Sequence, residues 1–169
     1  MIEKEDNKIL LLSKYGLDCG IYDEDYRKIT WENCTLREWL NDEFLNTAFS
    51  DHEQEYIVDS NLENYDNVDF GTDGGKDTKD KVFLLSIYEA TEYLLCNYYA
   101  NMTCRATEYA SSRGVYTCDM GTCAWWLRSP GYNSQVAAIV DVEGEIGGVG
   151  VGYDEYGIAV RPAIWINLE

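Results

Sequence analysis

Few residues in this sequence are placed to carry a reaction. His52 is the only histidine, and it lies between Asp51 and Glu53, in the predicted first turn of a short helix. No nearby serine or cysteine forms a nucleophile–base pair with His52, so we expect an exposed surface residue. No pair among the 31 acidic residues stands out as an acid–base couple. The sequence therefore predicts neither a catalytic site nor a bound cofactor, and we expect the protein not to be an enzyme.

The cysteines do not form a recognisable metal or redox motif. Their spacings are irregular, no C-x-x-C pair occurs, and a single histidine cannot complete a zinc set. The six are Cys19, Cys34, Cys96, Cys104, Cys118 and Cys123. We expect buried free thiols, with a Cys118–Cys123 disulfide as the alternative.

One segment partly matches a calcium-binding loop. Carboxylates fall at its positions one, five, nine and twelve, which are Asp69, Asp73, Asp77 and Asp80. Position three is a glycine, position twelve is the shorter aspartate, and no predicted helix precedes the loop. A solvated loop is the favoured interpretation, and calcium is the weaker hypothesis.

The charge balance limits the partners of this chain. Its 169 residues contain 31 Asp+Glu and 13 Lys+Arg, a formal charge of −18. A surface this acidic repels phosphate backbones and anionic lipid, so we expect binding neither to nucleic acid nor to a membrane surface. Residues 1–80 hold 21 of the acids and 8 of the bases. A solvated surface explains this excess, and a phosphate mimic that occupies a basic groove on a partner is the alternative.

No export or membrane signal is visible in the sequence. The apolar run Ile9–Leu12 is too short for a signal-peptide core or a spanning helix. A cytoplasmic location is therefore the default expectation.

Helices are predicted mainly in the first two thirds of the chain. The capping box Thr35–Glu38 precedes apolar residues at helical spacing, which predicts an amphipathic helix over 36–48. Further capping boxes at Ser50–Glu53 and Ser86–Glu89 predict a short helical turn and a helix that ends near residue 98. A last short helix is predicted over 106–112.

Strands and one long loop complete the predicted architecture. Residues 60–79 are polar and rich in Asp, Asn and Gly, and loops of this length are usually functional or mobile. The predicted strands are 8–13, 17–22, 81–85, 136–142, 145–153 and 158–166. We predict a single α+β domain over 1–169, with N-terminal helices packed on short antiparallel sheets and a β-rich C-terminal half.

Aromatic residues are the most informative side chains. The chain contains 5 Trp and 14 Tyr, and several tyrosines lie in polar stretches. Tyrosine with Asn, Ser and Asp on loops is the composition of a recognition surface, because tyrosine supplies contact area at low entropic cost. Ordinary turn chemistry is the alternative. The candidate ligand-binding residues are Tyr132, Asn133, Ser134, Gln135, Tyr153, Asp154 and Tyr156.

The segment Trp125–Gly131, WWLRSPG, makes the chain resemble a known family. It is similar to the bacterial domain of unknown function 6273 family, common in gut Firmicutes. Matching segments follow in order along the chain: Leu10–Tyr15, Thr35–Asn41, Asp80–Ser86 and Val160–Ile166.

The resemblance implies a fold but no activity. The family has no established activity, and its layout is similar to the C-type-lectin-like and formylglycine-generating-enzyme superfold, in which loops on the final sheet display binding residues. Some members of that superfold are variable proteins of diversity-generating retroelements, whose altered positions favour Asn, Tyr, Asp and Ser. The resemblance to the formylglycine-generating enzymes is weaker, because Cys118 and Cys123 do not lie in the C-terminal sequence context in which the reactive cysteines of those enzymes occur.

Other residues of the matching segments are predicted to be structural. These are Trp39, Trp125, Arg128, Arg161 and Trp165. Trp125 and Trp126 alternate faces in an extended strand, so Trp126 is a further ligand-binding candidate, and burial of both is the alternative. Arg128 and Arg161 lie in apolar β segments, where a guanidinium needs acceptors. We expect both to be buried and paired, with an anion clamp as the alternative.

The start of the chain bears on its assembly. Family members usually have one more strand before this position, so Met1 is expected to lie just inside the domain. Either the start is truncated, or a sheet edge near residues 8–13 is left for another chain, which favours a homo-oligomer.

The sequence therefore predicts a non-catalytic module that presents a protein or glycan recognition surface on its C-terminal β-loops. An acidic inhibitor or nucleic-acid mimic that binds a basic partner is the alternative.

Overall fold

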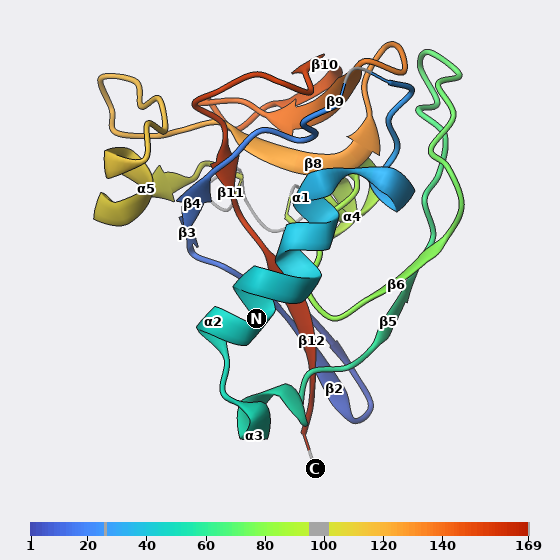
Figure 1. The fold of residues 1–169 in the computed structure, drawn as a ribbon, viewed down its shortest axis with the longest axis vertical. Helices are drawn as coiled ribbons and strands as arrows, with labels where there is room; N and C mark the ends of the chain where they lie inside the picture. The colour runs from blue at the N-terminus through green and yellow to red at the C-terminus, as the bar shows by residue number, and fades with distance from the viewer. Residues whose placement is uncertain (26, 95–101, 169) are drawn as a thin grey trace.

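Strands from the two ends of the chain pair in one sheet. The computed structural model describes residues 1–25, 27–94 and 102–168. Strand β2 (Lys8–Leu12) lies between β1 (Glu3–Glu5) and β12 (Ala163–Asn167), antiparallel to both (Figure 1). Leu10 pairs with Trp165, and both side chains are buried. The predicted open edge at residues 8–13 is therefore wrong, because β2 is the central strand.

A second, five-stranded sheet contributes much of the core. Its order is β10 (Ile146–Gly152), β9 (Val136–Val140), β8 (Trp125–Pro130), β11 (Ala159–Val160) and β4 (Asp18–Cys19). Neighbouring strands are antiparallel except β11 and β8, which run parallel. Every residue of β8 is buried, so this strand is the centre of the fold.

The predicted C-terminal strands form, with one interruption. The strand expected over 158–166 is divided at Arg161–Pro162 into β11 and β12, which belong to different sheets. Proline has no N–H to donate to a strand ladder, so the chain leaves one sheet there and enters the other. The mixed α+β fold class is confirmed.

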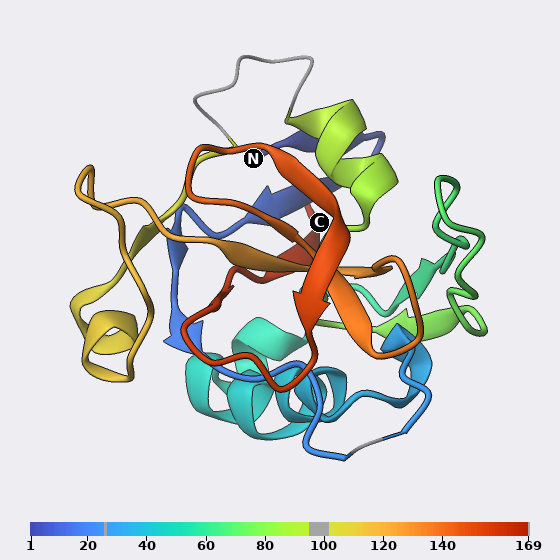
Figure 2. The ribbon, with the colours of Figure 1, turned by 90° about the horizontal axis from the view of Figure 1, so that it is seen from above.

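The longest helix covers residues 35–48, as predicted. It consists of α1 (Thr35–Trp39), a π-helical turn (Leu40–Phe44) and α2 (Leu45–Ala48), and it packs below the large sheet (Figure 2). The predicted Thr35 capping box is wrong, because the amide of Thr35 donates to the carboxylate of Asp23 at 3.0 Å. An acceptor from an earlier loop thus caps this helix.

The other capping boxes are confirmed. Ser50 caps α3 (Asp51–Gln54), and Ser86 caps α4 (Ile87–Tyr93), each with the glutamate three residues on. The predicted end of the second helix near residue 98 lies outside the described residues. The last predicted helix forms as α5 (Glu108–Ser112), and Thr107 caps it. A short 3-10 turn (Trp31–Asn33) lies just before α1.

The predicted long loop has a short hairpin at its base. Strands β5 (Ser60–Leu62) and β6 (Thr78–Asp80) pair antiparallel and leave residues 63–77 as the loop. A second small pair, β3 (Tyr15–Gly16) with β7 (Arg105–Ala106), is parallel. Residues 82–85 are fully buried but form no strand beyond a single bridge from Phe83 to Ala163, so that prediction is wrong.

The described cysteines are free thiols, as predicted; Cys19, Cys34, Cys104 and Cys123 are buried, whereas Cys118 is only half-buried. Cys123 lies opposite Cys104, whose carbonyl accepts its amide at 2.8 Å, and not opposite Cys118. Cys96 lies outside the described residues. Burial raises the pKa of Cys34 to about 12, whereas a hydrogen bond with the Thr122 hydroxyl lowers the pKa of Cys118. Across the described ranges, no helix is both long and apolar enough to cross a membrane.

These thiol environments predict an order of reactivity. Iodoacetamide at about pH 8 should modify Cys118 first, because the thiolate is the nucleophile and Cys34 stays protonated and buried. Cys34 should react only after unfolding in urea. Peptide mass spectrometry on timed samples measures the order, and equal rates at the two cysteines in the native protein would contradict it.

Candidate recognition surface

A buried arginine fixes the segments around the candidate site. Arg128 on β8 makes a bidentate ion pair with Glu89 of α4; the distance from Nη2 to Oε1 is 3.0 Å. Its guanidinium also donates to the carbonyls of Leu84 and Glu63 and to Oδ1 of Asn64, at 3.0–3.2 Å. One side chain therefore ties together the central strand, α4, the buried segment 82–85 and the start of loop 63–77.

Asn67 fixes the middle of that loop. Its side-chain amide donates to the carbonyls of Pro130 and Gly148, each at 2.9 Å. Its Oδ1 accepts the amide of Asp69 at 3.1 Å, and the whole residue is buried. Buried amide groups satisfied in this way make a loop rigid, so residues 65–70 are held against β8 and β10.

Large apolar side chains are exposed together where these segments meet. We call this surface the aromatic patch; its residues are Tyr65, Val68, Phe70, Tyr88, Tyr132 and Val149. Tyr65 packs edge-on against Tyr88, with ring centroids 6.2 Å apart, and Phe70 packs likewise against Tyr132 at 6.4 Å. The amide of Tyr132 donates to the carbonyl of Val149 at 2.9 Å.

The two halves of the aromatic patch are continuous. Between them lies Gly148, where a methyl group added to the α-carbon would lie 3.9 Å from both Asp69 Oδ2 and Ile87 Cδ1. In Figure 1 the green loop of residues 63–77 and the orange turn after β8 lie side by side at the right of the molecule, and Figure 2 shows them on the same side. The patch is thus assembled from α4, loop 63–77, the β8–β9 turn and β10.

A cavity of about 530 Å³ opens in the aromatic patch. Tyr65, Val68, Ile87 and Tyr88 supply its apolar walls, and Ser129 lies among its polar lining residues. Pockets that hold small molecules or side chains have volumes of this order. The patch is therefore hollowed and not flat.

The carboxylates around the cavity differ in how they are paired. The Tyr65 hydroxyl donates to Glu63, which raises the pKa of that tyrosine, and the amide of Gly74 donates to Asp66 at 2.9 Å. Lys28 lies 2.7 Å from Asp73 and holds the pKa of its carboxyl below the usual value. Over the described ranges, the carboxylate of Asp69 accepts no hydrogen bond and forms no ion pair. Of the two acids that line the cavity, Asp66 accepts a backbone amide and Asp69 has no partner among the described residues.

The predicted ligand-binding residues do not form one surface. Tyr132 lies in the aromatic patch, and Asn133 next to it accepts the amide of Gln135 at 2.7 Å, so it shapes the turn. Ser134 contributes its carbonyl, which accepts the amide of Ile29 at 3.0 Å. Three of these four residues thus stabilise the turn that presents Tyr132.

Two predicted contact residues are buried. Trp126 is 0% exposed, and its indole N–H donates to the carbonyl of Gly20 at 2.8 Å. Tyr153 is also buried, and its carbonyl accepts the amide of Tyr22 at 2.7 Å. Neither side chain has the accessible surface that a ligand contact requires, so both are removed from the candidate set.

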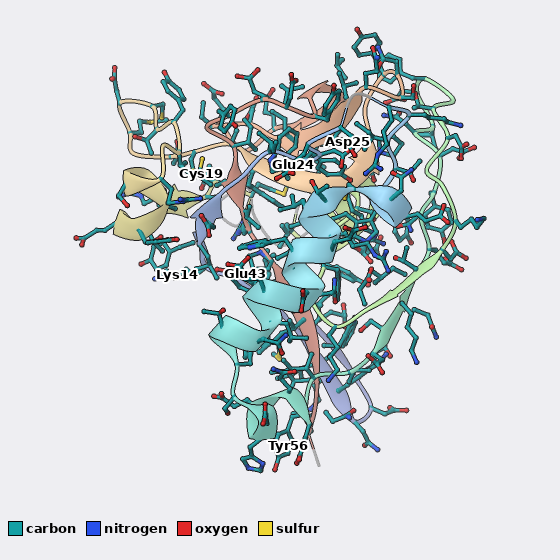
Figure 3. All side chains as sticks on the ribbon, viewed as in Figure 1. Lys14, Cys19, Glu24, Asp25, Glu43 and Tyr56 are labelled. Atoms are coloured by element: carbon teal, nitrogen blue, oxygen red, sulfur yellow. The ribbon has the colours of Figure 1, made fainter. Side chains whose placement is uncertain are left out.

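The remaining two predicted residues lie elsewhere. Asp154 and Tyr156 are exposed in the turn after β10, and Tyr156 borders a second cavity of about 440 Å³. That cavity is more polar, with Glu24 and Glu43 among its lining residues; Figure 3 labels both, with Cys19, beside α1. The recognition surface predicted from composition is therefore divided between two places.

The residues predicted to be structural are buried or half-buried. Trp125 is fully buried like Trp126, so the alternative in which both tryptophans belong to the core is the one observed. The Arg161 guanidinium lies 4.8 Å from the Trp125 ring centre and donates to the carbonyl of Ser13 at 2.9 Å. Trp165 is buried beneath Lys8, and Trp39 is half-buried against Phe44. Both arginines are buried and partnered within the protein.

The calcium-loop interpretation is not supported by the structure. Asp80 is buried and accepts hydrogen bonds from Trp31, Arg37 and Thr78, while Asp73 pairs with Lys28. Asp77 accepts the amide of Asn64 at 3.1 Å. Within the described part of the chain, no three acidic, cysteine or histidine residues are grouped to hold a metal ion.

Sequence reasoning missed most of the aromatic patch. Tyr65, Val68 and Phe70 are apolar residues inside an otherwise polar loop, and that contrast was the available signal. Tyr88 directly follows the first residue of α4 and faces solvent, but nothing local indicates that it meets Tyr65.

The fold and the patch define a mixed α+β domain with a preformed aromatic surface. The chain belongs to the Domain of unknown function (DUF6273) family, whose model matches residues 6–168. Curated proteins and solved structures gave no match.

Replacing Arg128 tests whether it holds the site together. R128A should lower the free energy of unfolding by about 3–5 kcal/mol, because it leaves Glu89 and several carbonyls without their buried donor. Urea denaturation measures this difference. The matched control R105A removes an exposed arginine and should change stability by less than about 0.5 kcal/mol. Similar losses in the two variants would contradict the central role of Arg128.

Proposed function

We propose that this protein is a non-catalytic binding module that contacts a protein partner through the aromatic patch. The observation that carries the proposal is the clustering of six exposed apolar side chains, three of which (Tyr65, Val68 and Tyr88) line a cavity. Single exposed apolar residues are ordinary on soluble proteins, whereas a contiguous hollowed patch marks a binding surface. The Val68 side chain is 89% exposed, so it contributes nothing to the hydrophobic core.

Rigidity supports the same proposal. Arg128 and Asn67 fix the backbone beneath the patch, so partner binding orders few additional residues. Tyrosine and phenylalanine side chains lose little rotamer freedom on contact, and paired rings already restrain one another here. A surface prepared in this way suits recognition.

The serine and threonine hydroxyl groups at the cavity bond to the backbone. Ser86 caps α4, Ser129 accepts the amide of Ile87 at 2.9 Å, and Thr91 donates to the carbonyl of Ile87 at 2.8 Å. His52, the sole histidine, is exposed on α3 beside Glu55. A nucleophile needs a base within hydrogen-bond reach, and these hydroxyls have backbone partners instead.

We further propose that the fold is C-type-lectin-like, with diversified or adaptable residues at the β8–β9 turn. The order of a Trp-Arg strand, short strands and a closing Val-Arg-Pro segment that leads into β12 supports this, as does the exposed Tyr132 in that turn. Fold likeness alone carries no function, so the binding proposal rests on the patch.

Selection from a random displayed peptide library tests the proposed function. Peptides selected on the wild-type protein should bind Y88A and Y132A at least about tenfold more weakly, because buried tyrosines dominate such interfaces. The control Y116A removes a similarly exposed tyrosine in the segment after α5, on the opposite side of the molecule, and should bind normally. Circular dichroism and melting curves should match the wild type for all three variants.

Two results would overturn the proposal. In one, the selected peptides bind the patch variants and Y116A as tightly as wild type. In the other, the peptide library yields no binder while a glycan array gives binding that Y88A abolishes, which would replace a protein partner with a sugar.

A further inference from the structure

We infer that the cavity of the aromatic patch takes a cationic side chain, an arginine or lysine of the partner, with its charge at Asp69. This inference rests on the proposed function and names the chemistry of the ligand. Three observations carry it: the aromatic walls, the available carboxylate and the sign of the surrounding charge.

The walls suit a cation with an apolar stem. Tyr65 and Tyr88 both line the cavity, and their rings meet at an interplanar angle of 65°. Ile87 and Val68 line the same space. Aromatic faces attract ammonium and guanidinium groups, and aliphatic walls cover the methylene stem of such a side chain.

Asp69 supplies the counter-charge. Only two acids, Asp66 and Asp69, line the cavity, and of these Asp69 is the one whose carboxylate has no hydrogen bond or ion pair within the described residues. The carboxylate of the nearby Asp73, in contrast, already forms an ion pair with Lys28, whose Nζ lies 2.7 Å from its Oδ2. Of the acids that line the cavity, Asp66 accepts a backbone amide, which leaves Asp69 as the stronger partner for an incoming cation.

The surrounding charge selects the sign of the ligand. Residues 59–77 contain six carboxylates and one lysine, and that lysine, Lys76, lies 3.1 Å from Glu32. Of the described residues that line the cavity, none is a lysine or an arginine. An acidic segment would be repelled by this loop and by the total charge of −18, whereas a basic segment is steered toward it.

The volume fits the same class of ligand. A cavity of about 530 Å³ can hold the planar head and stem of an arginine side chain or a small aromatic cation. The planar head also stacks on tyrosine rings, which an ammonium does less well. A guanidinium is therefore the better-matched of the two cations.

Benzamidine and benzamide provide a direct test, because they are nearly the same size and shape and differ in charge. Amide chemical shifts of the isotope-labelled protein should report benzamidine at Asn67, Ile87 and Tyr88. We expect its Kd to be at least about tenfold lower than that of benzamide, as for one charge-assisted hydrogen bond. High salt should weaken the binding of benzamidine and leave the binding of benzamide unchanged, because salt screens only the charged ligand.

Asp69→Asn is the decisive variant. It should reduce the preference for benzamidine to less than about threefold while benzamide still binds, since the apolar walls remain. Asp119→Asn makes the same charge change at an exposed residue on the loop after α5, on the opposite side of the molecule (Figure 1), and should keep the preference. Peptides selected on the wild type should also be enriched in arginine or lysine.

Equal binding of benzamidine and benzamide would overturn the cation assignment. It would leave the proposed function standing if the selected peptides still depend on Tyr88 and Tyr132. A preference for benzamidine that survives in D69N, or that falls equally in D69N and D119N, would overturn the role of Asp69. Binding of neither compound at the patch amides would overturn the cavity as a ligand site.

Discussion

The buried guanidinium of Arg128 is the interaction on which the arrangement of this protein depends. A charged group in a protein interior is tolerated only when acceptors surround it, and here they come from Glu89, Asn64 and the carbonyls of Glu63 and Leu84. These acceptors belong to segments that are far apart in sequence from β8. Satisfying one side chain therefore fixes α4 and loop 63–77 relative to the central strand. The aromatic patch is the outer surface of that arrangement.

The sequence predicts features whose causes are local. The helix over 35–48 and the caps at Ser50 and Ser86 each depend on residues within a few positions, so pattern reading finds them. It fails where a distant group substitutes for a local one, as when Asp23 caps the first helix in place of Thr35. It also fails for Trp126, because β8 is covered on both faces: Tyr22 packs against Trp126, and Arg161 packs against Trp125. Strand alternation gives two faces but does not say which of them is exposed.

The candidate site was predictable only in part for the same reason. Tyr132 could be named from its turn, since loop tyrosines among small polar residues are common in recognition surfaces. Tyr153 has the same local context, yet its backbone joins it to Tyr22 and its ring is buried. Tyr65 and Tyr88 meet across 23 positions of sequence because Arg128 connects their segments. No pattern within either segment encodes that contact.

The pairing of β2 with β12 has a consequence for how the protein is made. Leu10 can pair with Trp165 only after residues 11–165 have been synthesised. At usual translation speeds the apolar strand 8–12 waits roughly 8–30 s for residues 163–167. A nascent chain in this interval carries an unpaired hydrophobic strand, the kind of segment that chaperones bind and that aggregates when it is left exposed. Folding of this domain is therefore expected to finish only after residues 163–167 have emerged, when β12 closes the sheet on β2.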